Sequence, residues 1–369
     1  MGNVGPVTRL SGAGAGYRRA VRIRSSLLAL LAPLLVVLPG APAPAQTTAD
    51  LDQRVASTDQ RGAADTVLAI SIDGLSVAAI ERLGPVGMPN LHAFMDSGAA
   101  TLNARTEREQ TVTLPNHTGM VTGRRIEAAT GGHGVTWNDN RVRPRTVQAA
   151  AGERVESVFS TVDAAGGSSA LFAAKTKFRL WSRSWPNAID RTTVMESNAA
   201  LVEEIIADIN DEDRDFRFLH LSLPDVAGHA HGWMSPPYLS AVRRVDALLG
   251  LVVGSVTSDA QRRADTTILL TSDHGGQGAG HENPKVLDDY RVPFMARGAG
   301  VDAGVDLYEI NAGYHDPGTR RTIYGLARPP VRNGMVANLA LDLLGLPAVA
   351  DSEFDVTQDL SLSEPARAH

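Results

Sequence analysis

Three apolar runs of the sequence each end in an aspartate, and in two cases a histidine follows within four residues. These residues are Asp73, Asp225, His229, Asp273 and His274. Carboxylate oxygens and imidazole nitrogens are ligands of Zn²⁺, and also of Mn²⁺ and iron. Carboxylates that are buried together without a cation are penalised by like-charge repulsion and by the loss of hydration. The pattern therefore predicts a site for divalent metal ions.

A threonine in the stretch 111–124 (TVTLPNHTGMVTGR) has the surroundings of a nucleophile. Thr113 stands two residues before Pro115, and proline is favoured in the first turn of a helix. The free N–H groups and the dipole at a helix start attract anions such as a phosphoryl group. A hydroxyl at that point suits phosphoryl transfer, although a threonine there more commonly serves only as an N-cap.

Short apolar runs alternate with helical patterns along the chain. The predicted strands are Thr66–Ile72, Ser169–Ala174, Phe216–Leu223, Thr266–Thr271 and Val292–Ala296. The predicted helices are Asn198–Ile209, Tyr238–Val253 and Met335–Leu344. Strands that are apolar throughout indicate a mostly parallel sheet covered on both faces, and hence an α/β sandwich. The ligand site of such a sheet lies beyond the carboxyl ends of its strands, where the aspartates fall.

The first 45 residues have the composition of an export signal. They contain five arginines and no acidic residue, followed by the apolar run Leu27–Leu38 and the A-x-A sequence Ala43–Ala45. A helix over that apolar run would span about 18 Å, short of the roughly 30 Å of a bilayer core; a retained membrane anchor is the alternative. We therefore expect a secreted or extracytoplasmic protein with one catalytic domain over residues 46–369.

Charge and cysteine content limit the partners. Without its first 45 residues the chain has 30 basic and 41 acidic residues, a net charge of −11, which opposes a nucleic acid as structural partner. A small anionic substrate is compatible with this charge if a local cation offsets it. The chain contains no cysteine, which excludes disulfides and thiolate ligands.

Four motifs occur in the order IDG, TLPNH, PDVAGH and SDHG. In this order they resemble the alkaline phosphatase superfamily, and most closely its branch of type I phosphodiesterases and nucleotide pyrophosphatases. The resemblance extends from Val67 to Pro347. It implies a three-layer α/β/α sandwich and two divalent metal ions, in particular Zn²⁺. The sulfatase branch fits poorly, because TLPNH lacks the context of that branch's modified cysteine or serine.

The resemblance also implies roles for the matching residues. The implied ligands of one ion are Thr113, Asp73, Asp273 and His274. Those of the other ion are Asp225, His229 and a third histidine. Thr113 would be the nucleophile and form a phospho-threonine intermediate, while Asn116 would bind a non-bridging phosphoryl oxygen. His117 and His231 are expected to be structural or to lie behind the ligands.

Two histidines compete for the third position of the second ion. His281 follows His274 by seven residues and directly precedes the predicted strand Val292–Ala296, so it is expected near the active end of the sheet. His315 lies after that strand, beside Pro317, where a histidine is more often exposed. We predict His281, with His315 as the alternative.

The class of phosphoric ester is the least determined feature. No arginine stands beside Thr113, and the single Asn116 suits a monoanionic phosphodiester or nucleotide pyrophosphate better than a dianionic monoester. Lys175 stands at the end of a predicted strand and is expected to be solvated, with a position that reaches into the site as the alternative. A phosphomonoesterase, a phosphonate or sulfate ester hydrolase, or a catalytically inactive binding protein are the alternatives. Residues 141–190 are less regular and are a candidate cap over the site.

Overall fold

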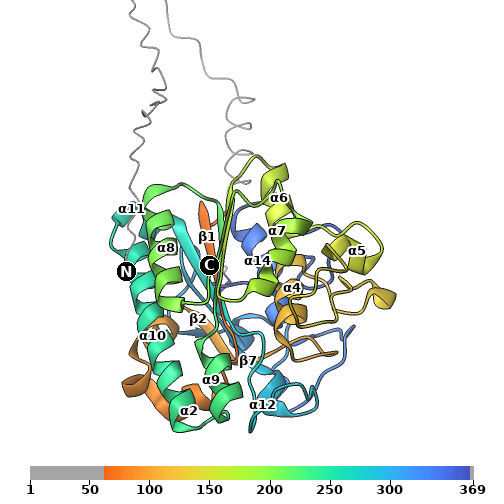
Figure 1. Ribbon diagram of the computed structural model, residues 1–369. Helices are drawn as coiled ribbons and strands as arrows, with labels where there is room; N and C mark the ends of the chain where they lie inside the picture. The colour runs from red at the N-terminus through yellow and green to blue at the C-terminus, as the bar shows by residue number, and fades with distance from the viewer. Residues whose placement is uncertain (1–61, 366–369) are drawn as a thin grey trace, which may run out of the picture. The chain divides into compact units, whose positions relative to one another are not determined.

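The computed structural model describes residues 62–365, so the predicted export signal lies outside the described residues. An eight-stranded sheet crosses this part of the chain in the order β4-β3-β5-β1-β6-β7-β2-β8 (Figure 1). The strands are β1 (Thr66–Ile72), β2 (Ala99–Arg105), β3 (Ser169–Ala173), β4 (Arg191–Val194), β5 (Phe216–Leu221), β6 (Thr266–Thr271), β7 (Arg291–Gly298) and β8 (Val305–Asp306). Within residues 62–365 only β7 runs antiparallel to its neighbours, so the sheet is mostly parallel.

Helices cover both faces of this sheet (Figure 1). One face carries α2 (Val77–Gly87), α3 (Pro89–Asp96), α8 (Asn198–Asp211) and α10 (Pro236–Thr257). The other face carries α4 (Thr113–Thr122), α6 (Val158–Ala164) and α14 (Val336–Leu343). Shorter helices are α5 (Val147–Ala151), α7 (Arg179–Ser184), α9 (Leu223–His231), α11 (Ala260–Asp265), α12 (Leu287–Tyr290) and α13 (Leu307–Ile310). The predicted three-layer α/β/α sandwich is confirmed.

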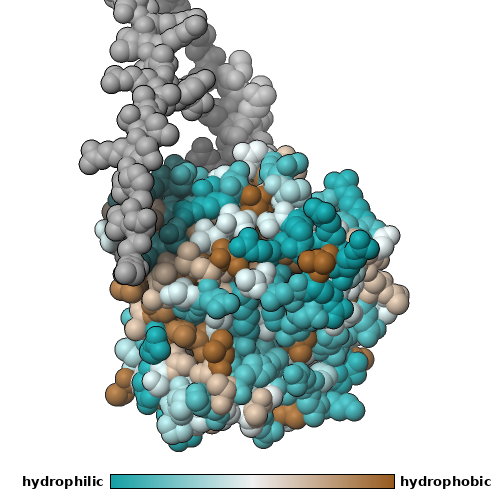
Figure 2. All heavy atoms as spheres, viewed as in Figure 1, coloured by the Kyte–Doolittle hydropathy of each residue, from teal (hydrophilic) through white to brown (hydrophobic). Residues whose placement is uncertain are grey.

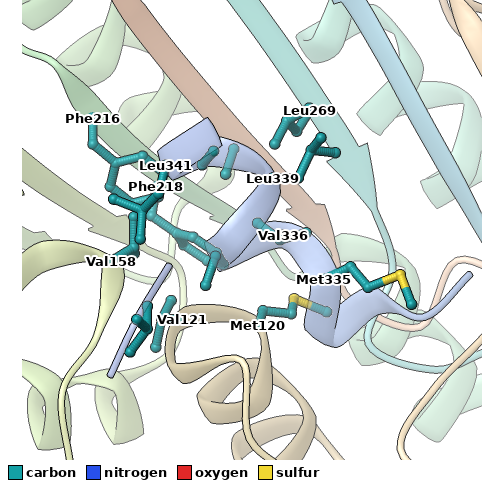
Figure 3. Close-up of a cluster of buried hydrophobic side chains, with 14 of the residues drawn as sticks. Met120, Val121, Val158, Phe216, Phe218, Leu269, Met335, Val336, Leu339 and Leu341 are labelled. Carbon is teal, nitrogen blue, oxygen red and sulfur yellow. The ribbon is translucent and has the colours of Figure 1, made fainter. Parts of the chain in front are cut away.

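Each layer of helices has its own apolar core, because neighbouring residues of a strand point to opposite faces. In β1, Val67 and Ala69 pack in the core under α4, α6 and α14, whereas Leu68 and Ile70 pack in the core under α8 and α10. Figure 3 shows part of the first core, where side chains of α4 and α14 meet those of β5 and β6. Burial on both faces explains why these strands are apolar throughout.

The strands missed by the sequence analysis lie toward the edges of the sheet. β4 and β8 are its two outermost strands, and all four residues of β4 are only partly buried. β2, next to β8, alternates buried and partly exposed residues. Less burial means a weaker apolar signal. The candidate cap 141–190 contributes β3 to the inner part of the sheet, so at least this portion is part of the sandwich rather than a lid.

The face of the molecule shown in Figure 2 is mainly hydrophilic. On the face shown in Figure 2, hydrophobic residues form small separate groups among polar ones. Between residues 62 and 365, none of the helices combines the length and the apolar character that a membrane crossing requires.

Candidate active site

The three predicted aspartates lie together at the carboxyl ends of three adjacent parallel strands, β5, β1 and β6. Asp73 follows β1, Asp225 lies in the first turn of α9 after β5, and Asp273 follows β6. All three side chains are buried. Gly74 permits this close approach: its φ is 70°, and a Cβ there would lie 2.9 Å from the Cα of Asp225.

Thr113 is the first residue of α4, which places its hydroxyl at the predicted helix start. The N-cap residue is Val112, and its side chain makes no capping hydrogen bond. Thr113 is therefore not the N-cap, although it is buried beside the aspartates. Its carbonyl oxygen accepts a hydrogen bond from Nδ1 of His117 (2.8 Å), which holds the first turn in place.

A first ligand group surrounds Nε2 of His274. This nitrogen lies 3.5 Å from Oδ1 of Asp73, 3.1 Å from Oδ2 of Asp273 and 3.8 Å from Oδ1 of Asp225. Nδ1 of His274 donates to the carbonyl oxygen of Gly275 (2.9 Å), so Nε2 carries the lone pair that a metal ion needs. Asp73, Asp225 and His274 form one candidate metal-binding group, and Asp273, the third predicted ligand, lies beside the same nitrogen.

A second group consists of Asp225, His229 and His281. The Nε2 atoms of the two histidines are 3.0 Å apart. Oδ1 of Asp225 lies 3.4 Å from Nε2 of His229 and 3.7 Å from Nε2 of His281. Nδ1 of His281 donates to the carbonyl oxygen of Thr111 (2.5 Å), which again leaves Nε2 free. His315 is exposed and apart from this group, so the geometry favours His281.

Four buried atoms of these groups have no hydrogen-bond partner: Oδ1 of Asp73, Oδ1 of Asp225, Oδ2 of Asp273 and Nε2 of His274. Such atoms are costly to bury unless something else binds them. Burial and the charge on Asp73 raise the pKa of Asp273 well above its ordinary value. The donor set of carboxylate oxygens and imidazole nitrogens fits divalent metal ions, Zn²⁺ in particular.

Lys175 contradicts the expectation of a solvated side chain. It follows β3 and is only 16% exposed, and its Nζ lies 2.6 Å from Oδ2 of both Asp73 and Asp225. Nζ is also 3.4 Å from Oγ1 of Thr113. Burial lowers the pKa of Lys175, but the charges of the two aspartates outweigh burial and raise it above its ordinary value. A position of Lys175 within the site was the less favoured alternative in the sequence analysis, because this contact depends on where β3 lies in the sheet.

Asn116 does not fit its predicted role in binding a phosphoryl oxygen. Its side-chain oxygen accepts from the N–H of Glu107 (2.9 Å), and its amide group donates to the carbonyls of Gln110 and Val112 (2.8 and 3.1 Å). The side chain is completely buried, and every polar atom of it is occupied. Asn116 therefore holds the 107–112 loop onto α4, and the prediction was wrong.

Asn138, which the sequence analysis did not single out, lies at the start of α4 instead. Its Oδ1 accepts from the N–H of Leu114 (3.0 Å), next to Thr113, and from Nζ of Lys177 (2.8 Å). The side chain is partly exposed, and its Oδ1 contact places it one residue from Thr113. One lone Asn in a loop has no sequence signal that separates this position from an ordinary turn.

Two further histidines support the aspartates from behind. Nδ1 of His220 accepts from the N–H of Ala174 (3.2 Å), so its Nε2 donates to Oδ2 of Asp73 (2.8 Å). His117 is buried, and its Nε2 accepts from the hydroxyl of Ser71 (2.8 Å). His231, by contrast, is exposed at the end of α9.

A cavity of about 490 Å³ adjoins Lys175. Its lining includes Lys177, Glu196, Asn198 and Val226, the residue after Asp225. Polar groups and a lysine line much of it, so it could receive the organic part of an anionic substrate.

Known proteins resemble this chain in sequence and in fold. Ectonucleotide pyrophosphatase/phosphodiesterase family member 1 of Mus musculus is 25% identical over 222 residues, which cover 56% of this chain and 24% of that protein. GPI ethanolamine phosphate transferase 1 of Yarrowia lipolytica is 29% identical over 134 residues, which cover 36% of this chain and 14% of that protein. The chain thus spans less than a quarter of the length of these relatives.

Among solved structures, an inactive variant of murine ectonucleotide pyrophosphatase/phosphodiesterase 5 in complex with AMP superposes with a TM-score of 0.56 at 16% identity. The match covers 80% of this chain and 99% of the other, and it shows a common fold. Residues 67–293 match the sequence family described as type I phosphodiesterase / nucleotide pyrophosphatase. Because this match spans more than half of the chain, the protein belongs to the type I phosphodiesterase / nucleotide pyrophosphatase family.

Proposed function

We propose that this protein hydrolyses phosphoric esters of small molecules through a phospho-threonine intermediate at Thr113, with two divalent metal ions as cofactors. The observation that carries the proposal is a helix-start hydroxyl beside two groups of carboxylates and histidines whose buried atoms lack partners. Family membership supports phosphoester hydrolysis as the reaction class. The complex of a structural neighbour with AMP supports a small phosphate-bearing ligand.

Asp73, Asp273 and His274, with Thr113, would hold one ion, and Asp225, His229 and His281 would hold the other. Bound ions would lower the pKa of the threonine hydroxyl and offset the charge of the reacting phosphoryl group. His220 and His117 keep Asp73 and the first turn of α4 in position.

The reaction is a double displacement at phosphorus, first by Thr113 and then by water. Thr113 Oγ1 attacks phosphorus and releases its proton to solvent, the ester P–O bond breaks, and the departing alcohol takes up a proton. Water then attacks the phospho-threonine, the bond between Oγ1 and phosphorus breaks, and phosphate leaves as the hydroxyl is restored. The free N–H groups at the start of α4 favour the negative charge of the phosphoryl group in both steps.

Replacing Thr113 tests the proposal. Thr113→Ala is expected to reduce turnover by at least about 10³-fold, because the attacking hydroxyl is removed, while metal content stays unchanged. Thr113→Ser keeps a hydroxyl and should retain part of the activity. Thr122→Ala, at the far end of the same helix, is the matched control. Unchanged kcat in Thr113→Ala would refute the nucleophile.

A second candidate is transfer of the phosphoryl-containing group to an alcohol, which the similarity to a GPI ethanolamine phosphate transferase favours. The first displacement would be the same, and an alcohol would replace water in the second. Product analysis with glycerol present separates the two: transfer gives a glycerol ester, and hydrolysis gives only the free phosphate. We further propose that the protein acts outside the cytoplasm, as its arginine-rich, apolar N-terminal sequence suggests.

A further inference from the structure

Lys175 is the one cation of the described residues whose charged group contacts both the nucleophile and the ligand aspartates. Its backbone is anchored next to the sheet, because the N–H of Ala174 donates to the carbonyl oxygen of His220 (3.2 Å). The two contacts of 2.6 Å to the aspartates then hold the ammonium group 3.4 Å from Thr113 Oγ1. Non-bridging oxygens of a phosphoryl group on that hydroxyl would lie within reach of the ammonium.

The contacts of Lys175 leave the unpartnered ligand atoms free. Nζ contacts Oδ2 of Asp73 and Oδ2 of Asp225, whereas Oδ1 of each faces the histidines of the two ligand groups. The unpartnered oxygens of these two residues are the Oδ1 atoms. Lysine and metal ions therefore use different oxygens of the same carboxylates, and both can be present together.

Lysine is rare in this protein. The sequence has 35 basic residues, of which only Lys175, Lys177 and Lys285 are lysines. Two of the three lie at the candidate site, where Lys177 donates to Asn138. Arginine supplies almost all other positive charge, so a compact ammonium at this point is a departure from the general usage of the chain.

We propose, on the basis of the proposed function, that Lys175 makes this site selective for a dianionic phosphoryl group, that is, for phosphate monoesters over diesters. Three ligand carboxylates and two divalent ions together carry a net charge of +1, which would match a monoanionic diester. Lys175 raises the total to +2, which matches a dianion. The sequence-based preference for diesters rested on Asn116 and on the lack of an arginine beside Thr113. The hydrogen bonds of Asn116 and the position of Lys175 remove these two reasons.

The first test compares kcat/KM for p-nitrophenyl phosphate and bis-p-nitrophenyl phosphate in Zn²⁺. The wild-type protein should prefer the monoester. Lys175→Met should lower kcat/KM for the monoester by about 100-fold and for the diester by less than about 10-fold, because only the dianion loses a charge-assisted contact. Lys285→Met removes an exposed lysine and is the matched control. A diester preference in the wild type, or equal losses for both esters, would overturn the inference.

A binding experiment separates this inference from the proposed function. In the Thr113→Ala protein, which cannot form the intermediate, titration calorimetry with inorganic phosphate should give a Kd that rises at least about tenfold when Lys175→Met is added. Metal content is measured on each variant, and Lys175→Gln replaces Lys175→Met if the latter loses metal or fails to fold. Equal Kd values with metal retained would refute a role for Lys175 in binding the dianion. Failure of the wild type to turn over either ester would instead refute the proposed function.

Discussion

Buried aspartates lie in two places at the sheet, a single one among arginines and a cluster of three at the candidate site, and their charges are satisfied in opposite ways. Asp208 of α8 accepts hydrogen bonds from three arginines, Arg191 of β4 and Arg214 and Arg217 near the start of β5, at 2.8 to 3.2 Å. Both of its oxygens are occupied. Asp73 and Asp225 share one lysine, Asp273 has no lysine or arginine contact among the described residues, and each of the three keeps one buried oxygen without a partner.

The difference separates a structural acid from a ligand. A buried carboxylate that only stabilises the fold needs its partners within the chain, as Asp208 has them. A carboxylate that binds a metal ion must keep an oxygen available, at a cost in stability of the metal-free protein. Glu107 shows a third solution: burial raises its pKa to about 8, so it is neutral at pH 7 although its Oε1 lacks a partner.

The largest expected effect comes from Asp273→Asn, which removes a ligand charge and keeps the shape. We expect kcat/KM to fall by at least about 10³-fold with loss of bound metal. The free energy of unfolding of the chelator-treated protein should change by no more than about 1 kcal/mol, because burial and the charge of Asp73 already disfavour the ionised form of Asp273. Activity assays and urea unfolding check both. Full activity with two metals per chain would contradict the ligand role.

The third histidine is tested by removing each candidate. His281→Ala should lower the metal content from two ions to one per chain and reduce the rate by about 10²-fold, because a ligand of the second group is lost. His315 is exposed, so His315→Ala should change neither quantity. Elemental analysis together with rates gives the answer. The reverse outcome would mean that His315 is the ligand.

Asp208→Asn is the same substitution at the aspartate whose two oxygens both have partners. It should lower the stability of the fold and leave activity and metal content unchanged. Three arginines would lose their charged partner, which should cost about 3 kcal/mol of the free energy of unfolding. The folded fraction should keep the wild-type kcat and metal content. A loss of metal in Asp208→Asn without a loss of stability would end the distinction between Asp208 and the cluster of three.

Glu107→Gln should leave activity unchanged and should alter the free energy of unfolding mainly at high pH. Burial raises the folded-state pKa of Glu107 from 4.5 to about 8, so the folded form holds a proton that the unfolded chain releases. Stability is therefore complete below about pH 4.5 and falls as pH rises toward 8. The amide cannot ionise, so the variant should exceed the wild type by on the order of 4 kcal/mol at pH 9 and by no more than about 1 kcal/mol at pH 5. Urea unfolding at the two pH values measures the free energy of unfolding of both proteins. A difference between variant and wild type that is the same at both pH values would show that Glu107 is charged in the fold.

Much of the fold follows from local patterns. The inner strands β1, β5 and β6 are covered on both faces, and this burial leaves continuous apolar runs that can be read directly. The edge strands β4 and β8 lack that signal, because partial exposure lets polar residues occupy them. The aspartates were predictable for a related reason: parallel strands end at the same edge, so residues directly after them converge.

The sequence by itself determined the class of fold, the residues Thr113, Asp73, Asp225 and Asp273 that follow its elements, and the type of chemistry those residues can support. Only the tertiary structure decided what each side chain contacts. It showed Asn116 occupied by the 107–112 loop, Asn138 at the helix start, and Lys175 between two aspartates from other strands. The partners of a side chain depend on which strands are neighbours in the sheet and on how far the side chain extends toward them. The local pattern of residues along the chain does not specify either of these.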